Sequence, residues 1–428
     1  MDENERRNMT LDEEEIMRQR MNERRQANAQ RQRAAQAKKQ KQRQIGKKAV
    51  LISKIALAVI VVLSLLFIAA RSLGNITFSK AADYISQSFS NLKPGDGYPV
   101  QMGSGTVDNM TSLGGNLAVL RDDGLILLNS TAKEINSYQH SYSKPVLNCI
   151  SNRFLLTDRT TGRFFIADSN EVLFESQLEK EVFCSTLGEK GNFAFSCAAD
   201  DAASVLKVYS SSYDNEFTFK CSEEYIISAS ISQNGKYIAA VGIGSKNAAV
   251  YSTVYIIDIK DQKVLSQLPI NAAKVNTIYF TENDIAVAVA ESSYYIIEIA
   301  KDKAEIVLDN KVENHVIASF TPCENGCFSM VFTKFGSIDS DILVFFDSSG
   351  KEKFNIETKT NVDCVDVSDK YVCFTDSNNI VYSYNYSGKL IGKTQLDMNA
   401  QQLTVIGKYA YALCYGDLLR LDVKNDIE

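Results

Sequence analysis

The feature that most constrains the fold is an internal repeat of four short strand-like runs. Residues Val146 to Ser176 read VLNCI, RFLLTD, RFFIAD and EVLFES, and residues Val362 to Gln395 read VDCVDV, KYVCFTD, IVYSYN and LIGKTQ in the same order. The runs are rich in β-branched and aromatic residues and are separated by turn residues. A unit of this kind cannot bury its apolar faces alone, so it must pack against further copies of itself.

Similar units recur along the second part of the chain at spacings between 36 and 49 residues. They begin near Val107, Val146, Val182, Ile226, Val275, His315, Val362 and Gln401. Periods near 40 residues with four strands each are typical of a β-propeller, whereas a solenoid has a shorter period and a sandwich does not repeat so often. We therefore predict an all-β propeller with eight four-stranded blades. The irregular units between Val182 and Lys274 leave seven blades as the alternative.

The two ends of the repeat region complement each other. The last unit supplies only three runs, at Gln402 to Ile406, Tyr409 to Tyr415 and Leu418 to Val423. The run Tyr98 to Met102 (YPVQM) resembles a strand but belongs to no unit. We expect it to be the fourth strand of the last blade, which would close the ring and cover an exposed strand edge.

An apolar run of 22 residues, Ala49 to Ala70, precedes the repeats. As a helix it would be about 33 Å long, enough to cross a hydrocarbon core of about 30 Å. Its one charge, Lys54, lies near the basic end, where its long stem can carry the ammonium group to the headgroups. The residues expected to form the membrane anchor are Val50, Leu51, Ile52, Ile55, Leu57, Val59, Ile60, Val61, Val62, Leu63, Leu65, Leu66, Phe67 and Ile68.

Charge around this run predicts its orientation. From Arg24 to Lys48 there are ten Lys or Arg residues and no acidic residue. The basic residues expected to set the topology are Lys38, Lys39, Lys41, Arg43, Lys47 and Lys48. The positive-inside rule then predicts a single-pass protein of the cell membrane with a cytoplasmic N-terminus and an exported C-terminal domain. A cleaved signal peptide is the alternative, but a leader of 48 residues and so long an apolar run argue against cleavage.

These features divide the chain into four parts. We expect a basic cytoplasmic tail over 1–48, partly helical or disordered and near anionic lipid headgroups, and a transmembrane helix over 49–70. A juxtamembrane helix and linker should follow over 71–97, where apolar residues at helical spacing precede Pro94. Residues 98–428 should form the extracytoplasmic β-propeller.

The net charge of the exported part excludes one class of partner. Beyond the apolar run there are 31 basic and 44 acidic residues, a net charge of −13. Nucleic-acid binding requires clustered Lys and Arg, so we expect no nucleic-acid partner for the propeller. A partner with a basic patch or bound cations is favoured instead.

Residues that carry chemistry are scarce. All nine cysteines lie in the exported part, mostly inside apolar runs, where a cysteine is usually a small buried hydrophobe. Cys323 and Cys327 flank a Glu-Asn-Gly turn and could form a disulfide across a hairpin. The two histidines, His140 and His315, have no companion motif, and no zinc-ligand spacing is present. We predict no catalytic site, no metal site and no cofactor.

One glycine pattern invites a binding interpretation. Gly242-Ile243-Gly244 resembles part of a phosphate-binding turn, but no helix is predicted after it to provide the N-terminal dipole. We interpret it as the apex of a hairpin.

Several short motifs resemble those of known propellers. Ser230 to Gly242 (SISQNGKYIAAVG) resembles the strand-turn-strand motif of WD40-like proteins. Asp158 to Ile166 (DRTTGRFFI), Asp347 to Phe354 (DSSGKEKF) and Asn385 to Gly392 (NYSGKLIG) resemble the turn of quinoprotein-like repeats. The whole layout is similar to an uncharacterised family of bacterial single-pass membrane proteins with an exported propeller. The chain has no Trp, whereas quinoprotein repeats typically end each blade with one, which weakens the case for a quinone cofactor.

These observations favour a binding or scaffold module over an enzyme. The leading hypothesis is a membrane-tethered propeller that presents a rigid face to a protein or to a cell-envelope polymer. The alternatives are a propeller enzyme of hydrolase or quinoprotein type with its site in the axial channel, and a transmembrane sensor.

Overall fold

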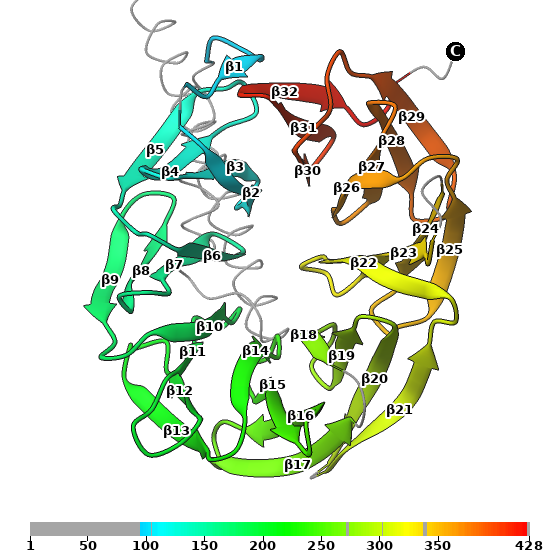
Figure 1. Ribbon diagram of the computed structural model, residues 1–428. Helices are drawn as coiled ribbons and strands as arrows, with labels where there is room; N and C mark the ends of the chain where they lie inside the picture. Colours follow the sequence, from blue (N-terminus) through cyan, green and yellow to red (C-terminus); the bar gives the residue numbers. More distant parts are fainter. Residues whose placement is uncertain (1–94, 104, 271–273, 302, 337–339, 426–428) are drawn as a thin grey trace, which may run out of the picture. The chain divides into compact units, whose positions relative to one another are not determined.

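The protein folds as an eight-bladed β-propeller. The computed structural model describes residues 95–103, 105–270, 274–301, 303–336 and 340–425. These residues form eight antiparallel sheets of four strands each, arranged around a central axis (Figure 1). The structure therefore confirms the all-β fold class and selects eight blades over seven.

Each blade begins with its innermost strand and proceeds outward. Blade 1 contains β2 (Val107–Leu113), β3 (Asn116–Arg121), β4 (Gly124–Leu128) and β5 (Glu134–Gln139). Blade 2 contains β6 (Pro145–Ile150), β7 (Arg153–Asp158), β8 (Arg163–Asp168) and β9 (Val172–Gln177). Blade 3 contains β10 (Val182–Leu187), β11 (Phe193–Cys197), β12 (Ser204–Tyr209) and β13 (Asn215–Cys221). Blade 4 contains β14 (Tyr225–Ile231), β15 (Tyr237–Lys246), β16 (Ala249–Asp258) and β17 (Lys263–Ile270).

The second half of the ring repeats this order. Blade 5 contains β18 (Val275–Phe280), β19 (Ile285–Ala290), β20 (Ser293–Ala300) and β21 (Lys303–Lys311). Blade 6 contains β22 (His315–Pro322), β23 (Phe328–Lys334), β24 (Asp341–Phe346) and β25 (Glu352–Glu357). Blade 7 contains β26 (Val362–Val367), β27 (Tyr371–Asp376), β28 (Ile380–Asn385) and β29 (Leu390–Gln395). Blade 8 contains β30 (Gln402–Ile406), β31 (Tyr409–Cys414), β32 (Asp417–Asp422) and β1 (Val100–Gln101).

The composition of the strands follows their place in a blade. Middle strands are buried on both faces because neighbouring blades cover them; five of the six residues of β7 are buried. Outer strands such as β9 have no buried residue. The apolar side chains of facing blades interlock, as where Phe154 of blade 2 meets Tyr138 of blade 1 with ring centroids 5.2 Å apart. Burial between blades therefore supplies the core, and no blade is stable without its neighbours.

The ring closes as expected, through the strand that precedes the first unit. In β1, Val100 pairs with Leu418 of β32, so residues from both ends of the propeller share blade 8. The ring of Tyr98 packs edge-on against Tyr411 with centroids 5.4 Å apart, and the guanidinium of Arg420 lies over the ring of Tyr409 at 4.2 Å. The pairing with β1 covers the edge of β32 at Asp417 and Leu418.

The two ends of the ring carry different connections, because successive strands alternate in direction. We call the end with the loops that lead from blade to blade, and with the turns between second and third strands, the upper face. The lower face carries the remaining turns. The chain joins the ring at the lower face, where the backbone N–H of Gly95 donates to Thr131 Oγ1 (2.9 Å) in the turn between β4 and β5.

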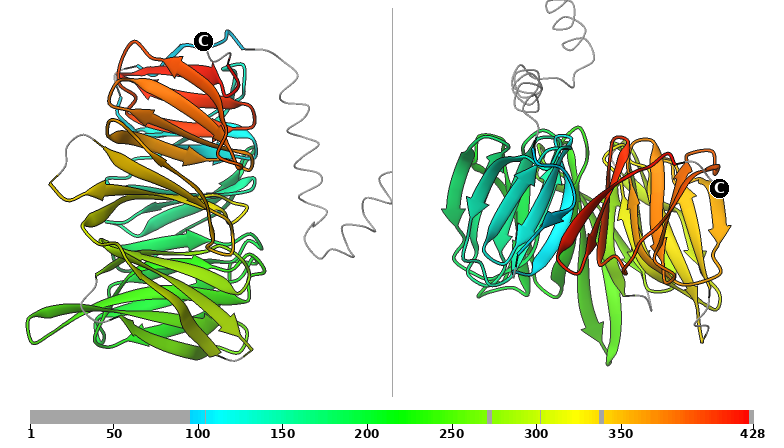
Figure 2. Two further views of the ribbon diagram at one scale, coloured as in Figure 1. Left: turned by 90° about the vertical axis from the view of Figure 1, so that its right-hand side faces the viewer. Right: turned by 90° about the horizontal axis from the view of Figure 1, so that it is seen from above.

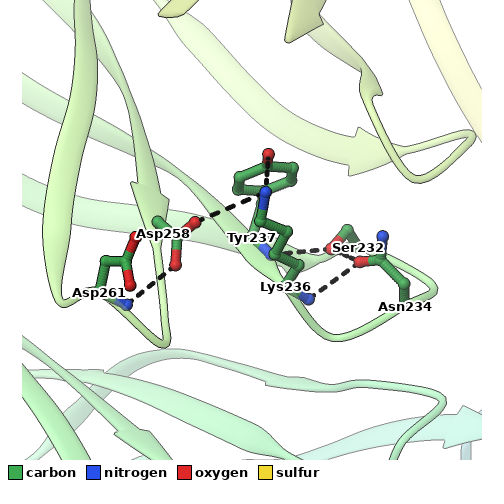
Figure 3. A network of polar contacts seen from close by, with 6 residues as sticks. All are labelled: Ser232, Asn234, Lys236, Tyr237, Asp258 and Asp261. Carbon is green, nitrogen blue, oxygen red and sulfur yellow. Dashed lines mark hydrogen bonds and ion pairs between the residues drawn. The ribbon is translucent and has the colours of Figure 1, made fainter. Parts of the chain in front are cut away.

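The WD40-like motif is a structural turn of the lower face. Ser232 Oγ donates to Asn234 Oδ1 (2.9 Å) and accepts the Tyr237 N–H (2.9 Å), which fixes the turn between β14 and β15 (Figure 3). The Lys236 ammonium donates to the Tyr237 hydroxyl (2.6 Å) and lies 3.8 Å from Asp258 Oδ2. The Asp258 carboxylate also accepts the Asp261 N–H (3.0 Å). The motif thus ties two turns of blade 4 together, and it supports the fold rather than a ligand.

The expected anchor lies outside the part of the chain that the structure describes. This holds for the tail over 1–48, the apolar run over 49–70 and the helix expected after it. Among the residues that are described, none belongs to a helix long and apolar enough to cross a membrane. Topology and localisation therefore stay predictions.

Candidate functional site

Polar side chains link the innermost strands of neighbouring blades around the axis. In blade 2, Asn148 Nδ2 donates to Ser185 Oγ of blade 3 (2.8 Å). In blade 4, Ser230 Oγ accepts the Phe280 N–H of blade 5 (3.0 Å). The Thr404 hydroxyl of blade 8 donates to the backbone carbonyl of blade 1 at residue 110 (3.1 Å). These three side chains of innermost strands therefore join neighbouring blades.

Asp366 holds the equivalent position in blade 7. Its Oδ2 accepts the Val405 N–H of blade 8 (2.6 Å), so the carboxylate spans the junction between β26 and β30. Burial raises the pKa of this carboxyl to about 7, although hydrogen bonds from the Val405 and Val367 backbones act in the opposite direction. A shift of this kind marks a group that titrates near neutral pH.

One contact crosses the ring. The N–H of Ser151, in the turn between β6 and β7, donates to Glu324 Oε1 (2.8 Å) in the turn between β22 and β23. These turns belong to blades 2 and 6, which lie opposite each other (Figure 1). The contact joins residues 173 positions apart in sequence at the lower face. It is a direct contact between two opposite blades.

The repeated Thr-Asp pairs hold loops of the upper face. Asp158 Oδ2 accepts the Thr161 hydroxyl (2.6 Å), and its Oδ1 accepts the Lys144 N–H (3.3 Å). Burial opposes ionisation of Asp158, but these hydrogen bonds outweigh it and lower the pKa of the carboxyl. Asp376 also holds its loop, since its Oδ1 accepts the Asn378 N–H (3.1 Å). Both carboxylates are structural.

The cysteines are inert thiols in this fold. All nine are free, and burial is the largest cause of a raised pKa in each of them. Cys323 and Cys327 do flank a hairpin turn, because the Cys323 N–H donates to the Cys327 carbonyl (2.9 Å). Both thiols are free in the structure.

The two histidines lie apart and serve local structure. His140 follows β5, its Nδ1 accepts the Tyr142 N–H (3.2 Å), and burial is the main reason that its pKa is lowered. His315 opens β22, with Nδ1 2.8 Å from the Glu313 carbonyl. Within the described ranges, no group of three or more His, Cys, Asp or Glu residues is placed to hold a metal ion. The described side chains thus offer no metal-binding constellation.

Most of the exposed large apolar side chains lie at the upper face, on blades 4, 6 and 8 and in the loop between blades 7 and 8. Eight large hydrophobic residues of the described chain are exposed, and five of them lie at this end of the ring. These five are Tyr225, Val250, Phe335, Met398 and Tyr415. Phe335 is 77% exposed and Tyr415 is 71% exposed, in turns that follow the second strands of blades 6 and 8. The other three lie on outer strands.

Our prediction from sequence did not single out these residues. A signal was present for two of them, since Phe335-Gly336 and Tyr415-Gly416 place an aromatic residue directly before a turn glycine. Such residues neither fill a core position nor favour a turn for their own sake. Exposed aromatic residues of this kind are candidates for contact with a protein partner.

Blade 4 extends furthest on this face. Strands β15 and β16 have ten residues each, and their hairpin projects beyond the neighbouring strands (Figure 2). The carboxylate of Glu224 lies buried at its base, where Thr253 and Tyr255 donate hydroxyl hydrogen bonds to it (2.7 and 2.8 Å). A Cβ at Gly242 would come within 2.2 Å of this carboxylate.

This geometry corrects our interpretation of Gly242 and Gly244 as a hairpin apex. Both lie within β15, and the apex is Asn247-Ala248, whose φ angles are 52° and 61°. The absent side chain of Gly242 makes room for Glu224, and that of Gly244 makes room for Tyr251. Glycine is required here for close approach rather than for a turn.

The propeller resembles solved structures of low sequence identity, which shows the fold alone. Saccharomyces cerevisiae Sqt1 matches with a TM-score of 0.56 and 10% identity, covering 78% of this chain and 100% of that one. Chaetomium thermophilum Sqt1, solved bound to the N-terminus of the ribosomal protein L10, matches with a TM-score of 0.52 and 10% identity, covering 75% of this chain and 98% of that one. The computationally designed Ika8 protein matches with a TM-score of 0.51 and 11% identity, covering 76% of this chain and 98% of that one.

Sequence comparison yields one family. No curated protein matches the chain significantly. Residues 86–419 match a family of unknown function, DUF5711.

Proposed function

The chain belongs to the DUF5711 family of unknown function, and we propose that it is a membrane-anchored binding module whose upper face holds a protein partner. Residues 49–70 anchor it in the cell membrane, with the basic tail in the cytoplasm and the propeller outside. Support for this orientation comes from the ten basic residues between Arg24 and Lys48.

The observation that carries the proposal is that five of the eight exposed large apolar side chains of the described chain lie at the upper face. Tyr, Phe and Met are enriched where proteins meet proteins, and Phe335, Met398 and Tyr415 are of these kinds. The chain joins the ring through Gly95 at the lower face, so the upper face is the end that this junction does not occupy. A protein partner is therefore favoured over a polar envelope polymer.

Two further observations support a binding role. The net charge of −13 beyond the apolar run favours a partner with a basic patch. A propeller of similar fold has been solved with the N-terminus of a ribosomal protein bound to it, so the fold can hold a protein segment. Three of the described carboxylates, Asp158, Asp366 and Glu324, accept backbone N–H groups, which is a structural role rather than a catalytic one.

The anchor is tested by labelling a single introduced thiol. No native cysteine is exposed, so background reaction with a membrane-impermeant maleimide should be low. Ser141→Cys places a thiol in an exposed loop of the upper face. We expect labelling on intact cells and retention of the chain in membranes after carbonate extraction. Labelling that appears only after lysis would contradict the orientation.

The binding face is tested by co-purification from crosslinked membranes. The double variant Phe335→Ser and Tyr415→Ser should reduce the recovered partner at least about fivefold, since each buried aromatic anchor contributes roughly 1 kcal/mol or more. Lys408→Ser, an exposed change in the lower-face turn of blade 8, is the matched control. Equal recovery with both variants would overturn the assignment of the upper face.

A further inference from the structure

The projecting hairpin of blade 4 leaves one strand edge open. Strand β14 pairs with β15 only as far as Tyr225 opposite Ile243. Strand β15 continues for three residues, through Lys246, paired with β16 on its other side. Among the described residues, no strand covers this extension of β15 on the side that faces the axis. An uncovered edge presents backbone groups that can pair with another chain.

The register identifies the open groups. Asn247 and Ala248 both have positive φ, as in a two-residue type I′ turn, so Lys246 and Ala249 form the hydrogen-bonded pair that flanks it. The next pair, Ser245 with Val250, is then not hydrogen-bonded within the hairpin. The N–H and C=O of Ser245 consequently point away from β16, toward the open edge.

Glu224 explains why the protein's own chain does not cover this edge. A continued β14 would place the residues before Tyr225 along Ser245. Instead, the Glu224 carbonyl accepts the Ser204 hydroxyl (2.8 Å), and its carboxylate is held by Thr253 and Tyr255. The chain is drawn into the junction of blades 3 and 4, and the base of the hairpin is rigid as a result.

The surroundings of the edge are apolar at its base and acidic nearby. Tyr225, 54% exposed, is the first residue of β14 and contacts Phe183 with ring centroids 5.7 Å apart. The neighbouring loops of blade 3 and the extension itself carry five exposed carboxylates and three exposed ammonium groups, a net charge of −2. These are Glu179, Glu181, Asp200, Asp201 and Glu223 against Lys180, Lys220 and Lys246. Two of the ammonium groups pair with Asp200 and Asp201 at 2.6 Å each.

We propose that the open β15 edge at Ser245 docks an extended, basic segment of a protein partner. The segment adds as a short strand through the N–H and C=O of Ser245, places an apolar side chain against Tyr225, and sets its basic side chains near the carboxylates. This deepens the proposed function, on which it rests, by naming the form and charge of the bound segment.

The test measures peptide binding to the purified full-length chain in detergent by fluorescence anisotropy. The probe is a fluorescein-labelled ten-residue peptide that alternates lysine with valine, and its counterpart alternates glutamate with valine. Ser245→Pro removes the outward N–H without a loss of hairpin pairing, whereas Ser245→Ala keeps it and is the matched control. The thermal midpoint of each variant confirms that it is folded.

We expect the lysine peptide to bind, the glutamate peptide not to bind, and Ser245→Pro to weaken binding at least fivefold while Ser245→Ala does not. Equal binding of the lysine peptide by Ser245→Pro and the parent would overturn strand addition at Ser245. Binding of the glutamate peptide would overturn the claim that the bound segment is basic. Self-association of the chain that is lost in Ser245→Pro would overturn the basic segment as the occupant of the edge and assign a second copy of this chain instead. The double variant Phe335→Ser and Tyr415→Ser changes other blades, so it tests the upper-face partner and not the β15 edge. Failure of the proposed function can therefore be told apart from failure of strand addition at Ser245.

Discussion

Replacing Asp366 with asparagine should stabilise the propeller increasingly as the pH rises. In the folded chain, burial raises the pKa of this carboxyl from an ordinary value of 3.8 to about 7. The folded state therefore holds the proton more tightly than the unfolded state. The stability that this provides is fully present below about pH 4 and is lost as the pH rises to about 7.

The size of the effect follows from the shift. A difference of about three pKa units corresponds to roughly 4 kcal/mol as an upper bound, and partial solvent exposure of Asp366 reduces this to about 1 to 3 kcal/mol. Asparagine carries no charge, and its amide oxygen can still accept the Val405 N–H. Blade 2 already has asparagine at the corresponding position, where Asn148 Nδ2 donates to Ser185 Oγ of blade 3.

The assay is urea unfolding of Asp366→Asn and the parent at pH 4, 6 and 8. The free energies of unfolding should nearly coincide at pH 4, and the variant should gain by about 1 to 3 kcal/mol at pH 8. Asp369→Asn, at an exposed position in the adjoining turn, is the control. A difference in the free energy of unfolding between variant and parent that is the same at every pH would show that the raised pKa of Asp366 does not affect stability.

Three further predictions concern the blade 4 junction, ring closure and topology. Gly242→Ala should lower the free energy of unfolding in urea by about 1 to 3 kcal/mol, because its Cβ would meet the buried Glu224 carboxylate. The Cβ of Gly244→Ala would meet the side chain of Tyr251, which can move, so a smaller loss for Gly242→Ala than for Gly244→Ala would contradict this prediction. Deleting residues 98–102 should lower the thermal midpoint by several degrees and promote aggregation, because it uncovers β32; an unchanged midpoint would show that β1 does not close the ring. Replacing Lys38, Lys39, Lys41, Arg43, Lys47 and Lys48 with glutamine should leave a fraction of chains inverted, seen as loss of maleimide labelling at Ser141→Cys; full labelling would exclude these residues as the topology signal.

The repeat made the ring predictable, because a period of four strands allows few architectures. The starts of the units at Val107, Val182, Val275, His315 and Val362 coincide with the first residues of innermost strands. Closure was also predictable, since an incomplete unit and an unassigned strand can satisfy each other's edges.

The candidate site was less predictable, for physical reasons. The extra length of β15 and β16 appeared in the sequence only as an irregular unit, and Gly242 was misread because close approach and turn formation use the same residue. The Ser151 to Glu324 contact joins residues 173 apart, which no local pattern encodes. Exposure of Phe335 and Tyr415 depends on which end of the ring their turns occupy.

Site-specific photocrosslinking in membranes, from two positions on blade 8, tests whether the partner binds the upper face of the propeller. A photoreactive residue at Tyr415 probes the upper face and one at Lys408 probes the lower face of the same blade. We expect a strong crosslinked species from position 415 and little or none from position 408. A partner captured mainly from position 408 would contradict it.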